Sequence, residues 1–265
     1  MKCLICNSDM AYYFSKEFNA GGLSNVDYWR CSNCGFSMSK THAEMTAGDW
    51  ASLNNKYHSD YQGKDLNPDD PRWITRLEAQ AKLLSDAAGI GLLKTGGKWL
   101  DYACGDGKLS ALLKNEGHAL LKYDRYMSHQ NDYLTDDGIS PGSFDFVITT
   151  SVFEHFTRRE QFEEVEALVA DSGVLGLHTL VRENIPRDPS WFYLLPAHCA
   201  FHTNKSMGLL FAQWGYTCSV YNVDSRLWLW FKQPIKNIKE CVERANLRPI
   251  SPFYIFKSGF VDYWK

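Results

Sequence analysis

The stretch from Lys98 to Ser110 constrains the fold of this chain more than any other. It opens with a short apolar run, ends that run in Asp101, turns through Gly105 and Gly107, and leaves as the start of a helix. A strand that feeds a helix through such a turn brings backbone N–H groups and the helix N-terminus to a ligand. Because many such turns carry glycines for steric reasons alone, downstream residues must support the interpretation.

Two later segments also place polar residues at the ends of predicted strands. Residues 120–124 read as a strand that ends in Asp124, roughly twenty residues beyond Asp101, where a nucleotide-binding unit has its ribose-binding acid. Asp132 and Tyr133 offer an acid beside an aromatic ring, which suits the edge and face of an adenine. Residues 143–156 then read as a buried strand that runs into a loop.

Together the segments DYACGDG, YD, ND and FDFVITTSVFEHF resemble the class I S-adenosylmethionine-dependent methyltransferases, over about residues 72–232. The resemblance implies an α/β fold with a Rossmann-like sheet and S-adenosylmethionine as the cofactor. It implies these cofactor-binding residues: Asp101, Ala103, Gly105 and Gly107 around the methionine portion, Asp124 at the ribose, Asp132 and Tyr133 at the adenine, and Thr150. The family has a helix and a strand after the Asp124 position, but here Asn131 follows within a few residues. Either this crossover is shortened or Asp132 does not contact the adenine.

The N-terminal segment contains two Cys-x-x-Cys motifs, formed by Cys3, Cys6, Cys31 and Cys34. Four thiolates at this spacing are typical of a closed, structural zinc site, and a segment of this size cannot bury a core without a metal. We therefore predict a small zinc ribbon over residues 1–40, with a hairpin turn at Gly21-Gly22. A buried or redox-active thiol set is the alternative.

Breaker residues divide the remainder of the chain. Asn67–Pro71 predicts a boundary between a linker or lid at 41–71 and the main domain at 72–232, and residues 233–265 form a C-terminal extension. Tyr57 and Tyr61 are four residues apart, so both contact the substrate if the linker is a lid; packing on the main domain is the alternative. We predict a helix over 158–170 closed by Gly173, a strand over 174–179, and antiparallel strands over 216–223 and 226–231.

The reacting groups are expected in the loops after the fourth and fifth strands, because ligands of open α/β sheets bind beyond the carboxyl ends of the strands. An imidazole is suited to general-base catalysis near neutral pH. His198 is the first candidate, His155 the second and His202 the third, with packing or helix capping as the alternative for each. Trp191 and Tyr193 are candidates for the walls of the acceptor pocket.

The order of ribbon, methyltransferase domain and histidine loop resembles the N-terminal parts of the deoxysugar C-methyltransferases. In that family an acid precedes the loop histidine, whereas Ala197 stands there in this chain. Tyr57 and Tyr61 match the family's tyrosine-rich stretch, and its extra C-terminal domain is missing. The resemblance implies a sugar acceptor, methylated at carbon or at oxygen.

Charge and hydropathy narrow the choice of partner. The net charge of −3 gives no basic field for nucleic acid, and no apolar run approaches the ~20 residues of a membrane span. The chain starts directly with a cysteine motif, which leaves no room for a signal peptide and predicts a cytoplasmic protein. We thus expect a methyltransferase that acts on a small molecule. The rivals are an RNA base methyltransferase that uses the ribbon for recognition, and a non-catalytic zinc-ribbon adaptor.

Overall fold

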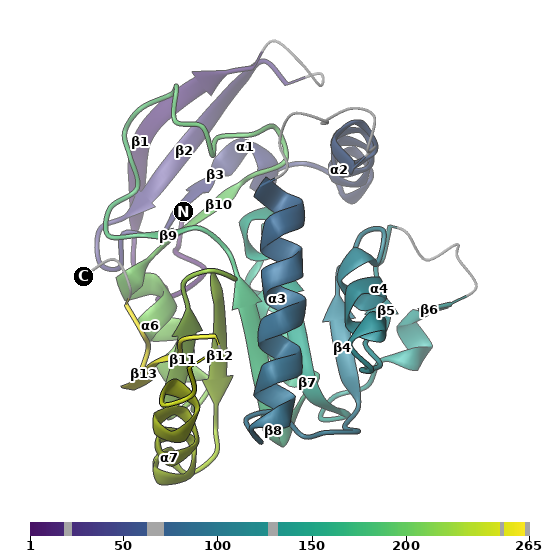
Figure 1. Cartoon of the computed structure of the whole chain (residues 1–265). Helices are drawn as coiled ribbons and strands as arrows, with labels where there is room; N and C mark the ends of the chain where they lie inside the picture. Colours follow the sequence, from purple (N-terminus) through teal and green to yellow (C-terminus); the bar gives the residue numbers. More distant parts are fainter. Residues whose placement is uncertain (19–22, 63–71, 127–131, 250–251, 263–265) are drawn as a thin grey trace.

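Two β-sheets organise the chain (Figure 1). The computed structural model describes residues 1–18, 23–62, 72–126, 132–249 and 252–262. The eight-stranded sheet has the order β13-β11-β12-β8-β7-β4-β5-β6, and the five-stranded sheet has the order β1-β2-β3-β10-β9. The predicted turn at Gly21-Gly22 and the predicted boundary at Asn67–Pro71 lie outside the described residues.

The strands of the larger sheet are β4 (Trp99–Tyr102), β5 (Leu121–Tyr123), β6 (Tyr133–Leu134), β7 (Phe144–Thr150), β8 (Val169–His178), β11 (Cys218–Asn222), β12 (Leu227–Phe231) and β13 (Ile255–Ser258). Strands β6, β5, β4, β7 and β8 are parallel, and β12 is antiparallel to both β8 and β11. The central strands are almost wholly buried, which their continuous apolar sequence dictates. This order and direction confirm the predicted α/β, Rossmann-like sheet.

The link between β5 and β6 is the shortened crossover that the sequence left as one of two readings. The two strands are parallel neighbours, with Lys122 opposite Tyr133. Residues 124–132 connect them, and 127–131 of these lie outside the described residues.

Helices cover the larger sheet: α3 (Arg72–Gly89), α4 (Lys108–Asn115), α5 (Arg159–Ala167), α6 (Asn204–Gln213) and α7 (Ile235–Asn246). In Figure 1, α3 runs along one face of this sheet, in front of β7 and β8. Its apolar residues recur at helical spacing, and Leu77, Ala81, Leu84 and Ala88 are all buried. Among the described residues, no helix has both the length and the apolar character needed to cross a membrane.

The smaller sheet joins the cysteine segment to a distant part of the chain. Its strands are β1 (Met10–Glu17), β2 (Asn25–Cys31), β3 (Ser37–Ser39), β9 (Val181–Arg182) and β10 (Ala200–Thr203). β3 pairs with β10, which directly follows the predicted histidine loop. Two helices, α1 (Lys40–Ala43) and α2 (Ala47–Gln62), then lead toward the main domain. The cysteine segment therefore shares a sheet with residues 181–203.

Two elements differ from the sequence expectation. The helix after the fourth strand ends at Ala167, and β8 starts at Val169 beside Phe144, so Gly173 lies inside this strand and does not close the helix. A side chain at Gly173 would place its Cβ 2.8 Å from Val169, which explains the glycine. Residues 233–265 add α7 and the edge strand β13, which pairs with β11.

Candidate functional site

The glycine turn between β4 and α4 has an unusual backbone. Ala103, Gly105 and Gly107 have φ angles of 58°, 55° and 71°, all in the left-handed region. That conformation costs an ordinary residue such as Ala103 about 1 kcal/mol. The positive φ favours glycine at position 107, and a Cβ there would lie 2.5 Å from Cδ of Lys122, whose side chain would have to shift. The turn stores strain and brings bare main chain to the carboxyl end of the sheet.

Asp101 carries a buried carboxylate at the end of β4. Its side chain is 1% exposed, and Oδ1 has no hydrogen-bond partner among the described residues. Burial raises the pKa of Asp101 well above its usual value, and the carboxylates of Asp124 and Asp106 raise it further. An acid in this environment favours a ligand that brings a positively charged group.

Two predicted residues hold the turn in place. The Oδ2 and Oδ1 atoms of Asp124 accept hydrogen bonds from the backbone N–H groups of Gly105 and Tyr126, each at 2.9 Å. The hydroxyl of Tyr133 donates to the carbonyl of Gly105 at 2.7 Å. The structure thus brings Asp101, Gly105, Asp124 and Tyr133 together, and their contact with a cofactor stays a prediction.

The remaining two predicted cofactor residues lie at the margin of this group. Asp132 is exposed and forms an ion pair with Lys122, which lowers the pKa of its carboxyl. The Lys122 ammonium also lies 4.4 Å from the ring centroid of Tyr133. Thr150 is half-buried at the end of β7, opposite His178 on β8.

A second group of polar side chains forms where two loops meet beyond β7. The 3-10 helix η2 (Phe153–His155) carries Glu154 and His155, and the loop before β10 carries His198. One potential ligand atom from each of the three lies within 4.8 Å of the other two. The rings of His155 and His198 are 5.0 Å apart and nearly perpendicular, at 84°. A hydrogen bond of 2.8 Å from the Cys199 N–H to the Glu154 carbonyl fastens the two segments together.

Hydrogen bonds fix two members of this group. Glu154 is fully buried, and its carboxylate accepts from the hydroxyl of Tyr193 at 2.5 Å and from that of Thr179 at 2.9 Å. Nδ1 of His198 lies 2.9 Å from the carbonyl oxygen of Tyr193. Because a carbonyl can only accept, Nδ1 carries the hydrogen of this bond. Burial, and then the Glu154 charge, raise the pKa of Tyr193 well above its usual value.

His202, the third predicted base, lies elsewhere. Its ring is fully buried and packs against the rings of Phe36, Phe153 and Phe162. Burial lowers the pKa of His202 to about 4. An imidazole enclosed in this way is a core residue and cannot reach an acceptor.

Two of the predicted substrate residues lie together: the ring centroids of Trp191 and Tyr193 are 5.6 Å apart. Trp191 is buried, and Tyr57 on α2 is half-buried. Tyr193 directs its hydroxyl to Glu154. The side chain of Tyr61 lies outside the described residues.

Comparison with known proteins identifies the domain. Residues 72–219 match a family described as a methyltransferase domain. The chain belongs to this methyltransferase family. A comparison with curated proteins finds no match.

Several solved structures resemble this methyltransferase at low identity. One is the 1,6-didemethyltoxoflavin-N1-methyltransferase of Burkholderia thailandensis with bound 1,6-didemethyltoxoflavin and S-adenosylhomocysteine. It is 12% identical, with a TM-score of 0.45, over 76% of this chain and 95% of that chain. An O-methyltransferase family protein of the same organism is 14% identical, with a TM-score of 0.49, over 68% of this chain and 62% of that chain. The plantazolicin methyltransferase in complex with S-adenosylhomocysteine is 12% identical, with a TM-score of 0.46, over 69% of this chain and 95% of that chain.

The glycine turn fits the cofactor of an S-adenosylmethionine-dependent methyltransferase. S-adenosylmethionine carries an ammonium and a sulfonium, and the Oδ1 atom of Asp101 is a buried acceptor that such a cation would satisfy. The absence of a side chain at Gly107 lets the Lys122 side chain and the Tyr133 hydroxyl pack directly against the turn. The bound cofactor supplies an activated methyl group, and this chain must align the acceptor with it.

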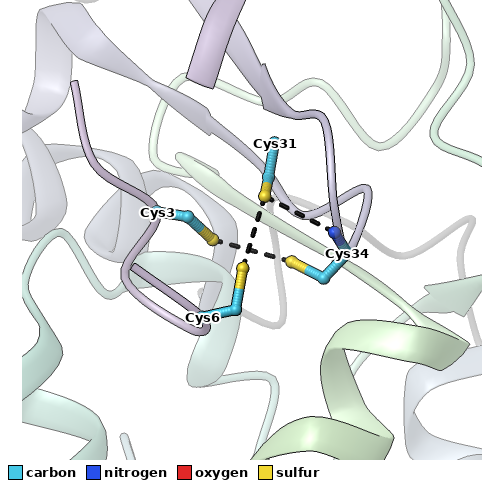
Figure 2. A group of neighbouring side chains, drawn as sticks. All are labelled: Cys3, Cys6, Cys31 and Cys34. Atoms are coloured by element: carbon cyan, nitrogen blue, oxygen red, sulfur yellow. Dashed lines mark hydrogen bonds between the residues drawn. The ribbon is translucent and has the colours of Figure 1, made fainter. Parts of the chain in front are cut away.

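The four cysteines of this methyltransferase converge as the sequence predicts (Figure 2). Sγ of Cys3 lies 3.6 Å from Sγ of Cys34, and Sγ of Cys6 lies 3.5 Å from Sγ of Cys31. These separations are far too long for a disulfide bond. A hydrogen bond from the Cys34 thiol lowers the pKa of Cys3 to about 5, which favours a thiolate there.

Sequence reasoning missed Glu154 and Thr179 as members of the second polar group, beyond β7. Glu154 directly precedes His155 in the sequence. A single acid in an apolar stretch, however, does not indicate which residues it contacts in the fold. Thr179 follows β8 and reaches Glu154 only through the fold. Ser151 was missed too: it has a φ of 59°, and its hydroxyl lies 3.2 Å from Nδ1 of His178.

Proposed function

We propose that this methyltransferase transfers the methyl group of S-adenosylmethionine to a small molecule, a sugar or another biosynthetic intermediate, at oxygen or carbon. The resemblance of the ribbon and histidine loop to deoxysugar C-methyltransferases supports a sugar. The observation that carries the choice of a small molecule over RNA is the packing of the cysteine segment against the methyltransferase domain.

Both cysteine motifs form hydrogen bonds with the methyltransferase domain. In the first, the carbonyls of Leu4 and Ile5 accept from Arg159 on α5, and Ile5 also accepts from Gln213 on α6. In the second, Lys205 donates to the Asn33 carbonyl at 2.6 Å, and the Thr203 hydroxyl donates to the Cys34 carbonyl. RNA recognition requires an accessible basic surface. These motifs instead serve to attach the segment, in a chain whose net charge is −3.

In the proposed complex, Asp101 accepts from the ammonium of the cofactor, and Asp124 holds the ribose hydroxyls. Tyr133, Asp132 and Thr150 contact the remaining cofactor surface. Transfer is an in-line displacement, so these residues act by alignment and by exclusion of water. His198, and after it His155, take part in removing the acceptor's proton. His202 has no part in this step because it is enclosed in the core.

We also propose that Cys3, Cys6, Cys31 and Cys34 bind a structural zinc ion. A tetrahedral zinc site with Zn–S bonds of 2.3 Å has sulfur–sulfur edges of about 3.8 Å, close to the separations of 3.5 and 3.6 Å. Four cysteine ligands leave no open position, so this ion would stabilise the fold and take no part in the reaction.

The test uses S-adenosylmethionine labelled in the methyl group, incubated with the full chain and a cell extract. We expect label in the acid-soluble small-molecule fraction, and at least tenfold less label with the Asp101→Asn variant at a concentration of S-adenosylmethionine below its Kd. Label in precipitable RNA, with a steep dependence on salt, would favour the RNA methyltransferase. Cofactor binding by calorimetry with no transfer to any fraction would contradict the proposal, and absent cofactor binding would favour the adaptor.

A further inference from the structure

We propose that Glu154, His155 and His198 form a second metal site, which binds a divalent transition-metal cation such as Zn²⁺ beside the acceptor. The three residues come from two separate segments, and one potential ligand atom of each lies within 4.8 Å of the other two. Two imidazoles and one carboxylate form a ligand set that suits Zn²⁺, Co²⁺ or Fe²⁺. Three protein ligands also leave a position open, which the four-cysteine site does not.

The hydrogen bonds around the three residues are those of supported metal ligands. A ligand histidine usually donates its second ring N–H to a carbonyl or carboxylate, which fixes the tautomer. Nδ1 of His198 does so, at 2.9 Å from the Tyr193 carbonyl, and in the proposed site Nε2 is the atom that binds the cation. The carboxylate of Glu154 is held in turn by Tyr193 and Thr179. Each carboxylate oxygen has a second lone pair for the metal.

The charge of Glu154 supplies the second argument. Its side chain is 0% exposed, and no ion pair among the described residues includes it. The partners of its carboxylate are neutral hydroxyls. A buried carboxylate is costly unless a positive charge compensates it. A cation at the site would supply that charge.

This inference rests on the proposed function for its role in the reaction and names the acceptor as an alcohol. An acceptor hydroxyl that takes the open position loses its proton to water more readily, because the cation lowers its pKa. The oxygen then forms the bond to the methyl carbon. The carbon–sulfur bond breaks with its electron pair left on sulfur, which gives the methyl ether and S-adenosylhomocysteine. His155 and His198 thereby promote proton loss as ligands of the cation.

The experiment titrates Co²⁺ into the full chain after dialysis against a mild chelator, which leaves a zinc-filled cysteine site intact. We expect one equivalent of Co²⁺ to bind with visible d–d absorption and without thiolate-to-cobalt charge-transfer bands. The Glu154→Gln variant, which is nearly isosteric, should lose this binding, and Tyr193→Phe should weaken it about tenfold. Glu160→Gln, an exposed acid on the neighbouring α5, is the matched control and should bind as the wild type does.

Charge-transfer bands, no uptake, or uptake that Glu154→Gln leaves unchanged would overturn the proposal. The same samples are tested for cofactor binding and methyl transfer, so that the two proposals fail separately. A chain that transfers methyl groups without binding Co²⁺ refutes the metal site and leaves the proposed function standing. A chain that binds Co²⁺ through Glu154 but transfers no methyl group supports the metal site and refutes the proposed function.

Discussion

Burial of Asp101 lowers the stability of the ligand-free chain. Its carboxylate is buried beside two other acids, and its Oδ1 atom lacks a hydrogen-bond partner among the described residues. Because the folded-state pKa is raised above the unfolded value, ionisation of Asp101 opposes folding at neutral pH. An ammonium group of the cofactor would reverse this penalty.

Asp101→Asn should therefore separate stability from binding. We expect the cofactor-free variant to melt a few degrees higher than the wild type, since about 1 kcal/mol is worth ~2–4 °C in a chain of this size. Its affinity for S-adenosylmethionine should fall at least tenfold in calorimetry. Asp137→Asn, at an exposed acid, is the control for both measurements. A destabilised Asp101→Asn variant with unchanged affinity would contradict this account of the residue.

The number of protons released when the cofactor binds provides a second measurement on Asp101. The pKa of Asp101 is raised in the free chain, and a bound ammonium would lower it, so binding should release protons wherever the two titration curves differ. The apparent affinity for S-adenosylmethionine should rise with pH through this range. Calorimetry in buffers of different ionisation enthalpy checks the sign, and net proton uptake would contradict it.

At the scale of elements, the glycine turn and β10 are the two pieces that position the site. The turn depends on backbone conformations that only a few residues tolerate, and on the space that Gly107 leaves for Lys122. β10 ties the cysteine segment to the loop that carries His198. That loop also receives hydrogen bonds from the ribbon side, from Lys16 to the Leu194 carbonyl at 2.7 Å and between His42 and the Pro196 carbonyl at 2.8 Å.

Gly107→Ala tests the turn. Both Gly107 and Gly91 have positive φ, of 71° and 82°, but a Cβ at Gly91 would meet nothing within 4 Å. Gly91→Ala is thus a control for backbone strain alone. We expect both variants to lose about 1 kcal/mol of folding free energy and only Gly107→Ala to lose cofactor affinity. Equal affinities in the two variants would show that the close approach of Lys122 to the turn has no bearing on the ligand.

Cys34→Ser tests the connection through β10. Loss of one thiolate ligand should weaken zinc binding and loosen the loop at residues 192–199. Methyl transfer should therefore fall at least tenfold. The glycine turn lies in the other sheet, so cofactor affinity should change less than threefold. Hydrogen exchange of the Cys199 N–H, which bonds to Glu154, should increase in the variant. Unchanged exchange and activity would mean that the ribbon does not brace the loop.

At the scale of the whole molecule, burial of ionisable groups makes stability depend on pH. The pKa of His202 is lowered to about 4, so the unfolded chain binds one more proton at this residue between about pH 6.5 and pH 4. The free energy of unfolding should fall as the pH drops through this window, by about 3 kcal/mol from this residue. His202→Phe should remove that part of the slope in urea titrations. An unchanged slope would show that His202 is not enclosed as described.

The sequence was sufficient to predict the sheet and the grouping of polar residues around the glycine turn, because those features are local. Asp101 and Gly107 belong to one turn, and Asp124 ends the next strand along the chain. The group around Glu154 could not be predicted in this way. Glu154, Tyr193 and Thr179 meet only through the fold, and His202, four residues after His198, packs in an aromatic core. The helix expected over residues 158–170 also ends earlier in the structure, because Val169 pairs with Phe144 as the first residue of β8.

The central claim is that the glycine turn between β4 and α4 binds S-adenosylmethionine through Asp101 and Asp124. A crystal structure of the full chain with S-adenosylhomocysteine tests it most directly. We predict that the amino group of the ligand lies within hydrogen-bond distance of Asp101 and that its ribose hydroxyls contact Asp124. Ligand density elsewhere, or a turn filled by packed side chains with both carboxylates turned away, would contradict the claim.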